Sequence, residues 1–436
     1  MNMFTNYESF KTLQELAQKP IDLSNDENLS IRRLSDFSAE ALNLKLFYGT
    51  ERITPKVMDA LYSLATESKA CEKMHEMQNG GILNQIHGFD CENRMVLHTA
   101  MRDFFEPRIS AEPASKASNC AYKELEKLKG FLDSIENEGY ENLIQIGIGG
   151  SELGPKAIYL ALEAYRKKGR NVHFISNVDP DDAAMILSKV ELSKTLVVVV
   201  SKSGTTLETL TNEEIVRERF LEEGLSPQNH FLAVTGKESP MDNPERYRES
   251  FYIWDYVGGR YSATSMVGCV ALAFALGMEK LLDFLRGASN MDKIALEENP
   301  KKNLPLISAL LGIWNHNFLS LPTTAIIPYS QALSRFPAHL QQCDMESNGK
   351  RIDKDANQVD FWTGPIIWGE IGTNGQHSFY QLIHQGTIPV PIEFIGFVQN
   401  QCQVDRVFKE TTSQEKLLAN LFAQSIGLAM GKKSEN

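Results

Sequence analysis

Short apolar runs alternate with helix-like stretches through the middle of the chain. The runs are rich in valine, isoleucine, leucine and phenylalanine, as buried strands are. They cover residues 142–150, 171–177, 195–204, 230–236 and 250–255. Between them, the stretches at 155–169 and 207–224 carry apolar residues at helical spacing. This alternation predicts a parallel sheet whose strands are joined by helical crossovers.

The same alternation returns, less regularly, from about Asn303. Strands are predicted at 323–330, 364–370 and 391–398, and helices at 304–321, 333–345, 376–386 and 412–431. The pattern therefore predicts a second α/β region after the first.

The first part of the chain differs from both of these regions. It is rich in charged residues and helix formers, and residues 57–77 are typical of an amphipathic helix. We therefore divide the chain into a helical N-terminal extension (1–115), a first α/β domain (116–298) and a second α/β domain (299–436).

Composition and charge narrow the classes of partner. The chain carries 56 acidic and 44 basic residues, a formal net charge of −12. Nucleic-acid backbones and anionic membranes bind to positive fields, so neither is an expected partner. The hydrophobic fraction of 42% is ordinary for a globular protein and excludes intrinsic disorder. An anionic ligand must then be held by a local group of donors.

The cysteines and the apolar runs indicate the cellular compartment in which the protein is expected. The six cysteines are scattered and form no Cys-x-x-Cys pair, which argues against a zinc ribbon or a disulfide framework. Reduced thiols in the cytoplasm are the simpler interpretation. The longest apolar stretch, residues 266–276, is about half the length of a bilayer span. We therefore expect a soluble, cytoplasmic protein without a targeting sequence.

The first candidate site is a glycine-rich turn, residues 147–155, between a predicted strand and a predicted helix. Glycine lets a backbone approach a ligand closely, and the free N–H groups of a helix start attract anions. A dinucleotide fingerprint would need glycine at position 152, where the chain has Glu152, and no P-loop motif occurs. For this segment alone, a tight turn without a ligand stays an alternative.

The second candidate site, residues 201–206, directly follows a predicted strand and precedes a helix. Its four hydroxyl groups and one lysine are a dense set of donors for a small tetrahedral anion. Ligands of open α/β sheets sit at this carboxyl edge. Helix capping would explain one or two of the hydroxyls but not all of them together. We therefore predict a phosphate site here.

Three further residues are suited to catalysis. Arg260 follows two glycines, which could hold it close to a ligand, although a surface salt bridge is the default for a lone arginine. Glu346 and His377 each lie near a glycine, and a carboxylate and an imidazole suit general acid–base work. His377 and His384 are two helical turns apart and no carboxylate is placed to complete a metal site, so we expect no metal.

Taken in order, these segments resemble the glucose-6-phosphate isomerase family. Five strings match stretches of that family: GIGGSELGP, VSKSGTTLET, GGRYSATS, MESNGK and GTNGQHSFYQLIHQG. The last two are highly specific, whereas GIGG alone is not. The resemblance implies two SIS-type α/β domains, each a parallel sheet layered with helices. It also implies interconversion of glucose 6-phosphate and fructose 6-phosphate in glycolysis and gluconeogenesis, through an enediol, without a cofactor, by a homodimer with shared active sites.

The resemblance also implies roles for individual residues. Glu346 would move a proton between C1 and C2 of the opened sugar, and Arg260 would stabilise the enediolate. His377, supplied by the neighbouring subunit, would help to open the pyranose ring. Gly150 and Gln342 would line the sugar pocket. The residues implied to contact the phosphate are Ser151, Ser201, Lys202, Ser203 and Thr206.

One family segment, resembling D-Q-x-G-V-E-x-G-K, does not occur in the 436 residues. In the family its glutamine contacts phosphate and its lysine assists ring opening, so we expect a truncated second α/β domain and slow turnover. Two alternative functions stay open. One is a SIS-type isomerase of amino sugars, which would lack MESNGK and GTNGQH together. The other is a sugar-phosphate-binding regulator with little or no catalysis.

Overall fold

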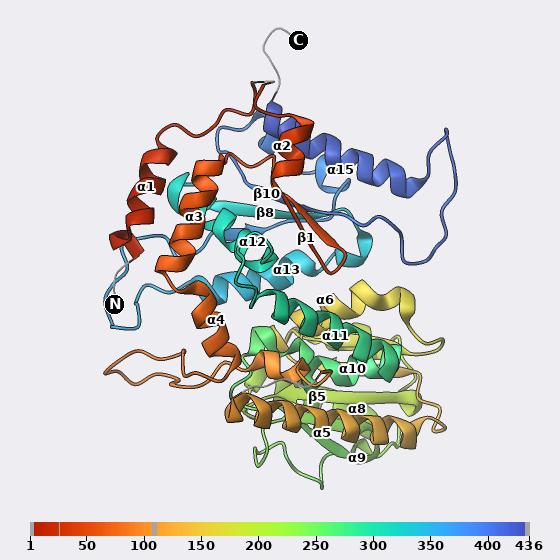
Figure 1. Cartoon of the computed structure of the whole chain (residues 1–436). Coiled ribbons are helices and arrows are strands. Elements are labelled where there is room, and N and C mark those ends of the chain that lie inside the picture. Colours follow the sequence, from red (N-terminus) through yellow and green to blue (C-terminus); the bar gives the residue numbers. More distant parts are fainter. Residues whose placement is uncertain (1–3, 26, 107–110, 432–436) are drawn as a thin grey trace. The chain divides into compact units, whose positions relative to one another are not determined.

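The computed structural model describes residues 4–25, 27–106 and 111–431 (Figure 1). The chain forms two compact units. Unit 1 comprises Met1–Glu76, Ile86–Asp90 and Asn290–Asn436, and unit 2 comprises Met77–Gln85 and Cys91–Ser289. The division into an extension and two α/β domains stays a prediction. The structure adds that residues 1–76 group with 290–436.

Unit 2 is built on a five-stranded parallel sheet. Its strand order is β4-β3-β5-β6-β7, and the strands are β3 (Asn142–Ile146), β4 (Asn171–Ile175), β5 (Thr195–Ser201), β6 (Phe231–Thr235) and β7 (Glu249–Tyr252). Four of these strands lie within apolar runs predicted from the sequence, and β7 begins one residue before its predicted run. The first sheet of the sequence analysis is thus confirmed.

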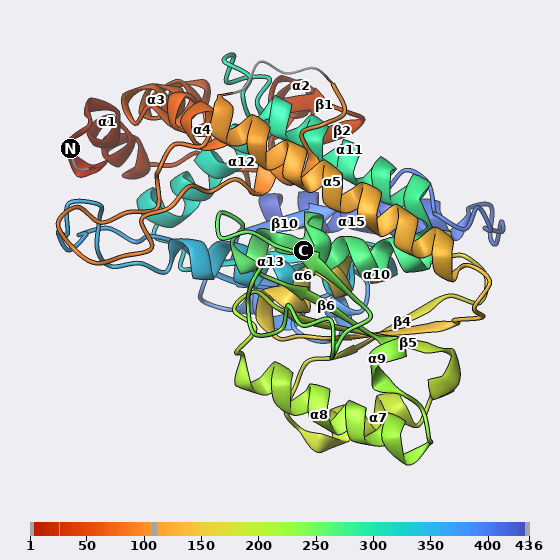
Figure 2. The same ribbon diagram turned by 90° about the horizontal axis from the view of Figure 1, so that it is seen from below.

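Helices cover both faces of this sheet. They are α5 (Glu112–Ile135), α6 (Leu153–Leu162), α7 (Pro180–Leu187), α8 (Leu207–Glu222), α9 (Pro227–His230), α10 (Met266–Leu276) and α11 (Met278–Ile294). Figure 2 shows α5 and α10 above the strands and α7 and α8 below them.

The central strand β5 shows why the sheet is buried on both faces. All seven of its residues are buried. Val198 and Val200 join the apolar cluster that contains α5 and α10, whereas Val197 and Val199 join the cluster that contains α7 and α8. Because side chains alternate along a strand, a continuous apolar run satisfies both faces at once.

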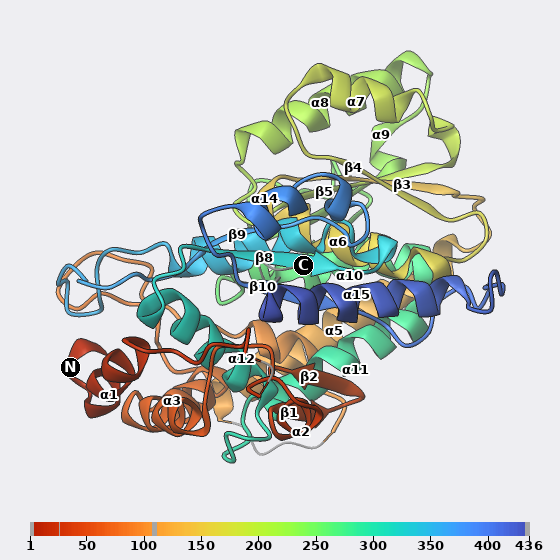
Figure 3. The same ribbon diagram turned by 90° about the horizontal axis from the view of Figure 1, so that it is seen from above.

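Unit 1 contains a smaller parallel sheet of three strands in the order β10-β8-β9. The strands are β8 (Thr323–Pro328), β9 (Ile366–Trp368) and β10 (Ile392–Ile395). Helices α14 (Tyr380–Gln385) and α15 (Ser413–Met430) are seen beside them in Figure 3. Tyr380 and Leu421 from these two helices pack with Ala325 and Ile327 of β8. The second predicted sheet is therefore present.

A second apolar cluster of unit 1 contains helices α1 (Glu8–Ala17), α3 (Pro55–Glu67) and α12 (Leu304–Ile313). The other helices are α2 (Ile31–Asp36), α4 (Ala70–Gln78) and α13 (Phe336–Gln341). Helices α1 and α3 lie side by side in Figure 1, and Leu13, Leu61 and Trp314 are fully buried in their cluster.

The structure differs from the sequence analysis in two places before residue 115. The predicted helix over 57–77 is divided into α3 and α4 at Lys69, whose φ of 57° is left-handed and cannot continue a helix. Strands β1 (Ser38–Ala41) and β2 (Leu44–Phe47) form an antiparallel hairpin that the sequence analysis did not predict. Its two-residue turn, Leu42 and Asn43, has positive φ at both positions, as hairpin turns of this length favour.

Within residues 4–25, 27–106 and 111–431, we find no helix with the length and apolar character that crossing a membrane requires.

Candidate functional site

Three loops of unit 2 carry the predicted phosphate and enediolate residues. The turn Gly149–Ser151 follows β3, the segment 202–206 follows β5, and the turn Gly259–Thr264 follows β7. These strands are parallel, so all three loops leave the carboxyl edge of one sheet. The structure thus brings together the loops that the sequence analysis singled out.

The first and third of these loops are in intimate contact. A Cβ atom built on Gly150 would lie 2.2 Å from both the carbonyl carbon and the oxygen of Gly259. Ser262 Oγ donates to Gly259 O at 2.6 Å and lies 3.4 Å from Gly150 O. The backbone at Gly150 therefore rests directly on the backbone that leads into Arg260, and this approach explains why a glycine stands here.

The hydroxyl-rich loop is organised by its own side chains. Ser201 Oγ lies 2.9 Å from Thr206 Oγ1, and the N–H of Gly204 donates to Ser201 Oγ at 3.1 Å. Ser203 Oγ accepts from the N–H of Thr205 at 3.2 Å. Gly204 has a φ of 69°, the left-handed region that suits glycine in so tight a turn.

Thr206 is the residue before α8, yet its side chain makes no capping hydrogen bond. Helix capping, the alternative weighed for these hydroxyls, therefore does not account for Thr206. The amide groups of the first turn of a helix attract anions when no side chain covers them. The loop and the start of α8 together offer backbone and side-chain donors to one small anion.

Lys202 contributes positive charge to the same loop. Its Nζ donates to Val257 O at 3.3 Å. Burial lowers the pKa of Lys202, and the positive charge of Arg94 lowers it further, which places two cations near the loop. Arg94 is paired with Glu92 at 2.7 Å. Arg94 was not among the residues predicted from the sequence.

Arg260 lies in a turn with an aromatic neighbour. Its guanidinium carbon is 5.3 Å from the ring centre of Tyr261. His98 stacks on the ring of Tyr261, with the two ring centroids 4.6 Å apart and the two ring planes inclined by 20°. His98 was also missed by the sequence analysis. Its spacing of four residues from both Arg94 and Arg102 is the pattern that could have drawn attention to it.

The other predicted residues lie in unit 1. Gln342 and Glu346 are the first and last residues of a π-helical turn that continues α13. Such turns are rare and are frequent at functional sites. The ammonium group of Lys350 donates to the carbonyl oxygens of Glu346 and Ser347, each at 2.7 Å. These bonds hold the end of the turn and leave the Glu346 side chain exposed.

His377 ends the turn Gly375–His377, which precedes α14. The preceding residue, Gln376, donates to Tyr329 Oη at 2.7 Å and contacts Asn420 Oδ1. Tyr329 is fully buried at the carboxyl end of β8. The turn is therefore anchored to the small sheet, and the His377 side chain is exposed.

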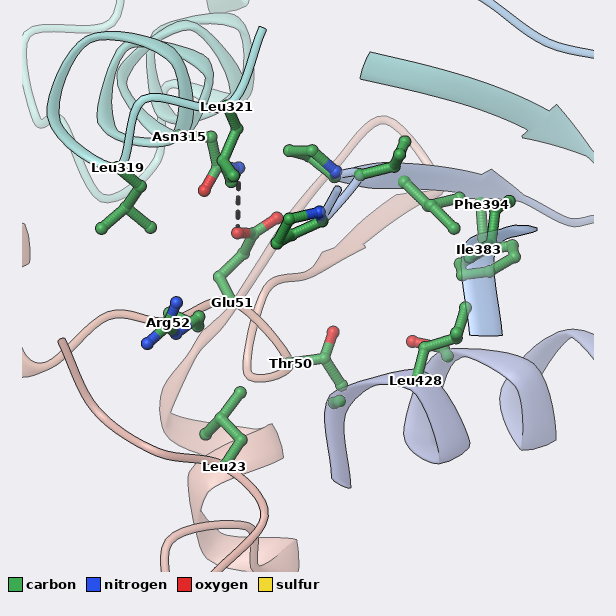
Figure 4. A pocket seen from close by; sticks show the side chains of 16 residues that line it. Leu23, Thr50, Glu51, Arg52, Asn315, Leu319, Leu321, Ile383, Phe394 and Leu428 are labelled. Atoms are coloured by element: carbon green, nitrogen blue, oxygen red, sulfur yellow. Dashed lines mark hydrogen bonds between the residues drawn. The ribbon is translucent and has the colours of Figure 1, made fainter. Parts of the chain in front are cut away.

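A separate cavity of about 270 Å³ lies within unit 1, and none of the predicted residues lines it. Figure 4 shows Glu51 inside this cavity with its carboxylate accepting a hydrogen bond from Asn315 at 3.0 Å. Burial, with the nearby charge of Glu393, raises the pKa of Glu51 to about 6. Unlike the segment 201–206, this cavity holds a carboxylate beside its donors, which include Arg52 and Asn315.

The family model described as phosphoglucose isomerase matches residues 47–436. The chain belongs to this family. The resemblance found in the sequence is thereby confirmed over nearly the whole chain rather than in its motifs alone.

Individual members of the phosphoglucose isomerase family agree with this assignment. The glucose-6-phosphate isomerase of Protochlamydia amoebophila is 56% identical over 435 residues, which are 99% of this chain and 81% of that protein. The glucose-6-phosphate isomerase of Desulfotalea psychrophila is 52% identical over 450 residues, and the match covers 100% of this chain and 84% of that protein.

A solved member of the phosphoglucose isomerase family has the same fold. The crystal structure of a glucose-6-phosphate isomerase from Chlamydia trachomatis superimposes with a TM-score of 0.98 at 48% identity, and the match covers 100% of this chain and 84% of that one. The predicted fold class, an α/β protein with parallel sheets layered with helices, is confirmed.

Proposed function

We propose that this chain catalyses the reversible isomerisation of glucose 6-phosphate and fructose 6-phosphate through an enediol. The observation that carries the proposal is the convergence of three loops at one sheet edge in a member of the phosphoglucose isomerase family. Relatives with 56% and 52% identity are named glucose-6-phosphate isomerase.

The phosphate is assigned to the loops after β3 and β5. Hydroxyl groups and the Lys202 ammonium donate to its oxygens, and charge-assisted bonds of this kind are the stronger ones. The residues assigned are Ser151, Ser201, Lys202, Ser203 and Thr206. Their support is the paired hydroxyl groups of the loop and the uncapped start of α8.

The proton transfer is assigned to Glu346. Its carboxylate removes the proton from C2 of the open aldose, the C–H electron pair forms the C1=C2 bond, and O1 receives the negative charge. Protonation of O1, loss of the O2 proton and return of the carbon-bound proton to C1 complete the ketose. Arg260 stabilises the charge on the enediolate, and a fixed cation does so most effectively in a site that excludes water.

Gly150 and Gln342 are assigned to the wall of the sugar pocket, and His377 to opening of the pyranose ring. All bonds made and broken lie within one substrate, so the proposal requires no cofactor. We also propose that the enzyme is a cytoplasmic homodimer in which Glu346 of one protomer and His377 of its partner serve one site.

Subunit mixing tests the shared site. Glu346→Gln and His377→Ala chains are each expected to be inactive, but a mixed dimer has one site with both lesions and one site with neither. Activity should therefore reappear after subunit exchange. If the mixture stays inactive although subunit exchange is proven, each chain builds its own site.

A coupled assay for glucose 6-phosphate formed from fructose 6-phosphate tests the function itself. It should be run beside calorimetry of phosphosugar binding. Binding without turnover would favour the alternative of a sugar-phosphate-binding regulator. The identities to named isomerases favour turnover.

A further inference from the structure

The stack of His98 on Tyr261 lies directly beside the proposed enediolate cation. His98 begins the turn His98–Arg102, and its ring lies 4.6 Å from that of Tyr261. The guanidinium of Arg260 lies 5.3 Å from the same ring. Tyr261 therefore contacts an imidazole and a guanidinium, and links the segment before α5 to the loop after β7.

The imidazole of His98 is kept neutral by its surroundings. Burial is the main cause that lowers its pKa to about 3, and the positive charges of Arg102 and Arg260 act in the same direction. Arg102 is itself held by a hydrogen bond of 3.0 Å from its guanidinium to Thr264 Oγ1. At neutral pH the ring thus adds no charge beside Arg260.

The ring of His98 carries a polar atom that makes no hydrogen bond within the part of the chain that the structure describes. Its Nδ1 atom is buried and has no hydrogen-bond partner among the described residues. An unpaired polar atom of this kind costs about 1–3 kcal/mol, a cost that phenylalanine would avoid. The contact of His98 with Tyr261 therefore depends on the shape of the ring and not on a hydrogen bond from Nδ1.

The loop that carries Arg260 is fixed from two sides. On one side the backbone of Gly150 rests on Gly259. On the other side Tyr261 is covered by His98, whose neighbour Leu97 is anchored by a bond of 2.9 Å from its N–H to Tyr256 O. Loss of either contact leaves the loop free to shift.

We propose that His98 is a positioning residue that holds Arg260 in place through the ring of Tyr261. The inference rests on the proposed function, because Arg260 is assigned there to the enediolate. A flat, neutral ring is what this role requires, since a second cation would repel the guanidinium. Misplacing a catalytic group by 1 Å lowers the reaction rate roughly 10²-fold.

Three variants of the full chain test the inference. His98→Ala removes the ring, and His98→Phe keeps a flat neutral ring. The matched control is His230→Ala, because His230 is a buried histidine of the same unit that lies just before β6, at the opposite edge of the sheet from the loops.

Turnover of fructose 6-phosphate is the first measurement. His98→Ala should lower kcat about 100-fold while KM changes less than about three-fold. His98→Phe should recover most of the lost turnover, and His230→Ala should keep the parent kcat. A His98→Ala enzyme within about three-fold of the parent kcat, or a His98→Phe enzyme as slow as His98→Ala, would overturn the inference.

Binding separates this inference from the proposed function. The probe is an aldonate phosphate, whose carboxylate mimics the enediolate, compared with inorganic phosphate alone. His98→Ala should weaken binding of the aldonate phosphate at least ten-fold and leave inorganic phosphate unchanged. An inactive parent chain would refute the proposed function, and the binding ratio would still decide this inference. Equal losses for both probes would mean that His98 has a general structural role.

Discussion

A methyl group at position 150 should displace the loop that carries Arg260. In Gly150→Ala the new Cβ would lie 2.2 Å from the carbonyl carbon and oxygen of Gly259 and 2.8 Å from the nitrogen of Arg260. Carbon atoms in contact are about 3.5–4.0 Å apart. The obstructing atoms belong to the backbone, so no side chain can rotate away. One of the two loops must therefore move by roughly 1.5 Å.

This displacement has a cost in stability and in rate. Overfilling a packed site typically costs about 1–3 kcal/mol, which should appear as a lower free energy of unfolding. A shift of 1 Å or more at a catalytic group lowers the reaction rate roughly 10²-fold. We therefore expect kcat for fructose 6-phosphate to fall about 100-fold. Binding of inorganic phosphate should change less, because all the residues assigned to the phosphate except Ser151 lie at a separate loop, the one after β5.

Gly130→Ala is the matched control. Gly130 lies within α5, and a Cβ atom built there meets nothing within 4 Å. Alanine in a helix interior is favoured over glycine by about 0.5–1 kcal/mol, so this variant should be slightly more stable and fully active. Denaturant unfolding and the coupled assay are run on both variants. If Gly150→Ala has the same kcat and the same free energy of unfolding as the parent chain, the contact with Gly259 does not position Arg260.

Three further predictions concern other side chains. Glu346→Gln should abolish exchange of the C2 proton with solvent, measured in deuterated water, while phosphate affinity stays near that of the parent; exchange at the parent rate would assign the base elsewhere. Thr206→Val combined with Ser203→Ala should weaken hexose 6-phosphate binding by a few kcal/mol in calorimetry, at about 1–3 kcal/mol for each lost bond, and unchanged affinity would exclude this loop as the phosphate site. Glu51 has a folded pKa of about 6 against an ordinary 4.5, so it favours the folded state at low pH and loses that contribution as pH rises from about 4.5 through 6. The change in unfolding free energy caused by Glu51→Gln should therefore be more favourable at pH 8 than at pH 4, by about 2 kcal/mol. Equal changes at both pH values would contradict the raised pKa of Glu51.

Local sequence was sufficient for the strands and for the loops that follow them. The run at 195–200 consists of a threonine, a leucine and four valines, a composition that favours a strand buried on both faces. Once parallel strands are predicted, their carboxyl ends must share one edge, which places Ser201 and Gly147 near each other. The loop that we propose as the phosphate site could therefore be placed at this edge from composition and order alone.

Other features depend on contacts between distant segments, which local sequence does not encode. His98 and Tyr261 are 163 residues apart in the numbering and meet only because the segment before α5 packs beside the loop after β7. Lys69, where the helix over 57–77 is divided, and Leu42, in the hairpin turn, have left-handed backbone that these residue types rarely adopt.

The sequence by itself determined the class of the fold, the positions of the strands along the chain and the residue types of the proposed donors, because residue type and hydrophobic period act locally. The tertiary structure alone decided which groups surround Arg260 and how tightly. The close approach of Gly150 to Gly259 and the neutral ring of His98 are consequences of packing. Packing depends on shape and burial summed over the whole unit, and the same residue types in another environment would make neither contact.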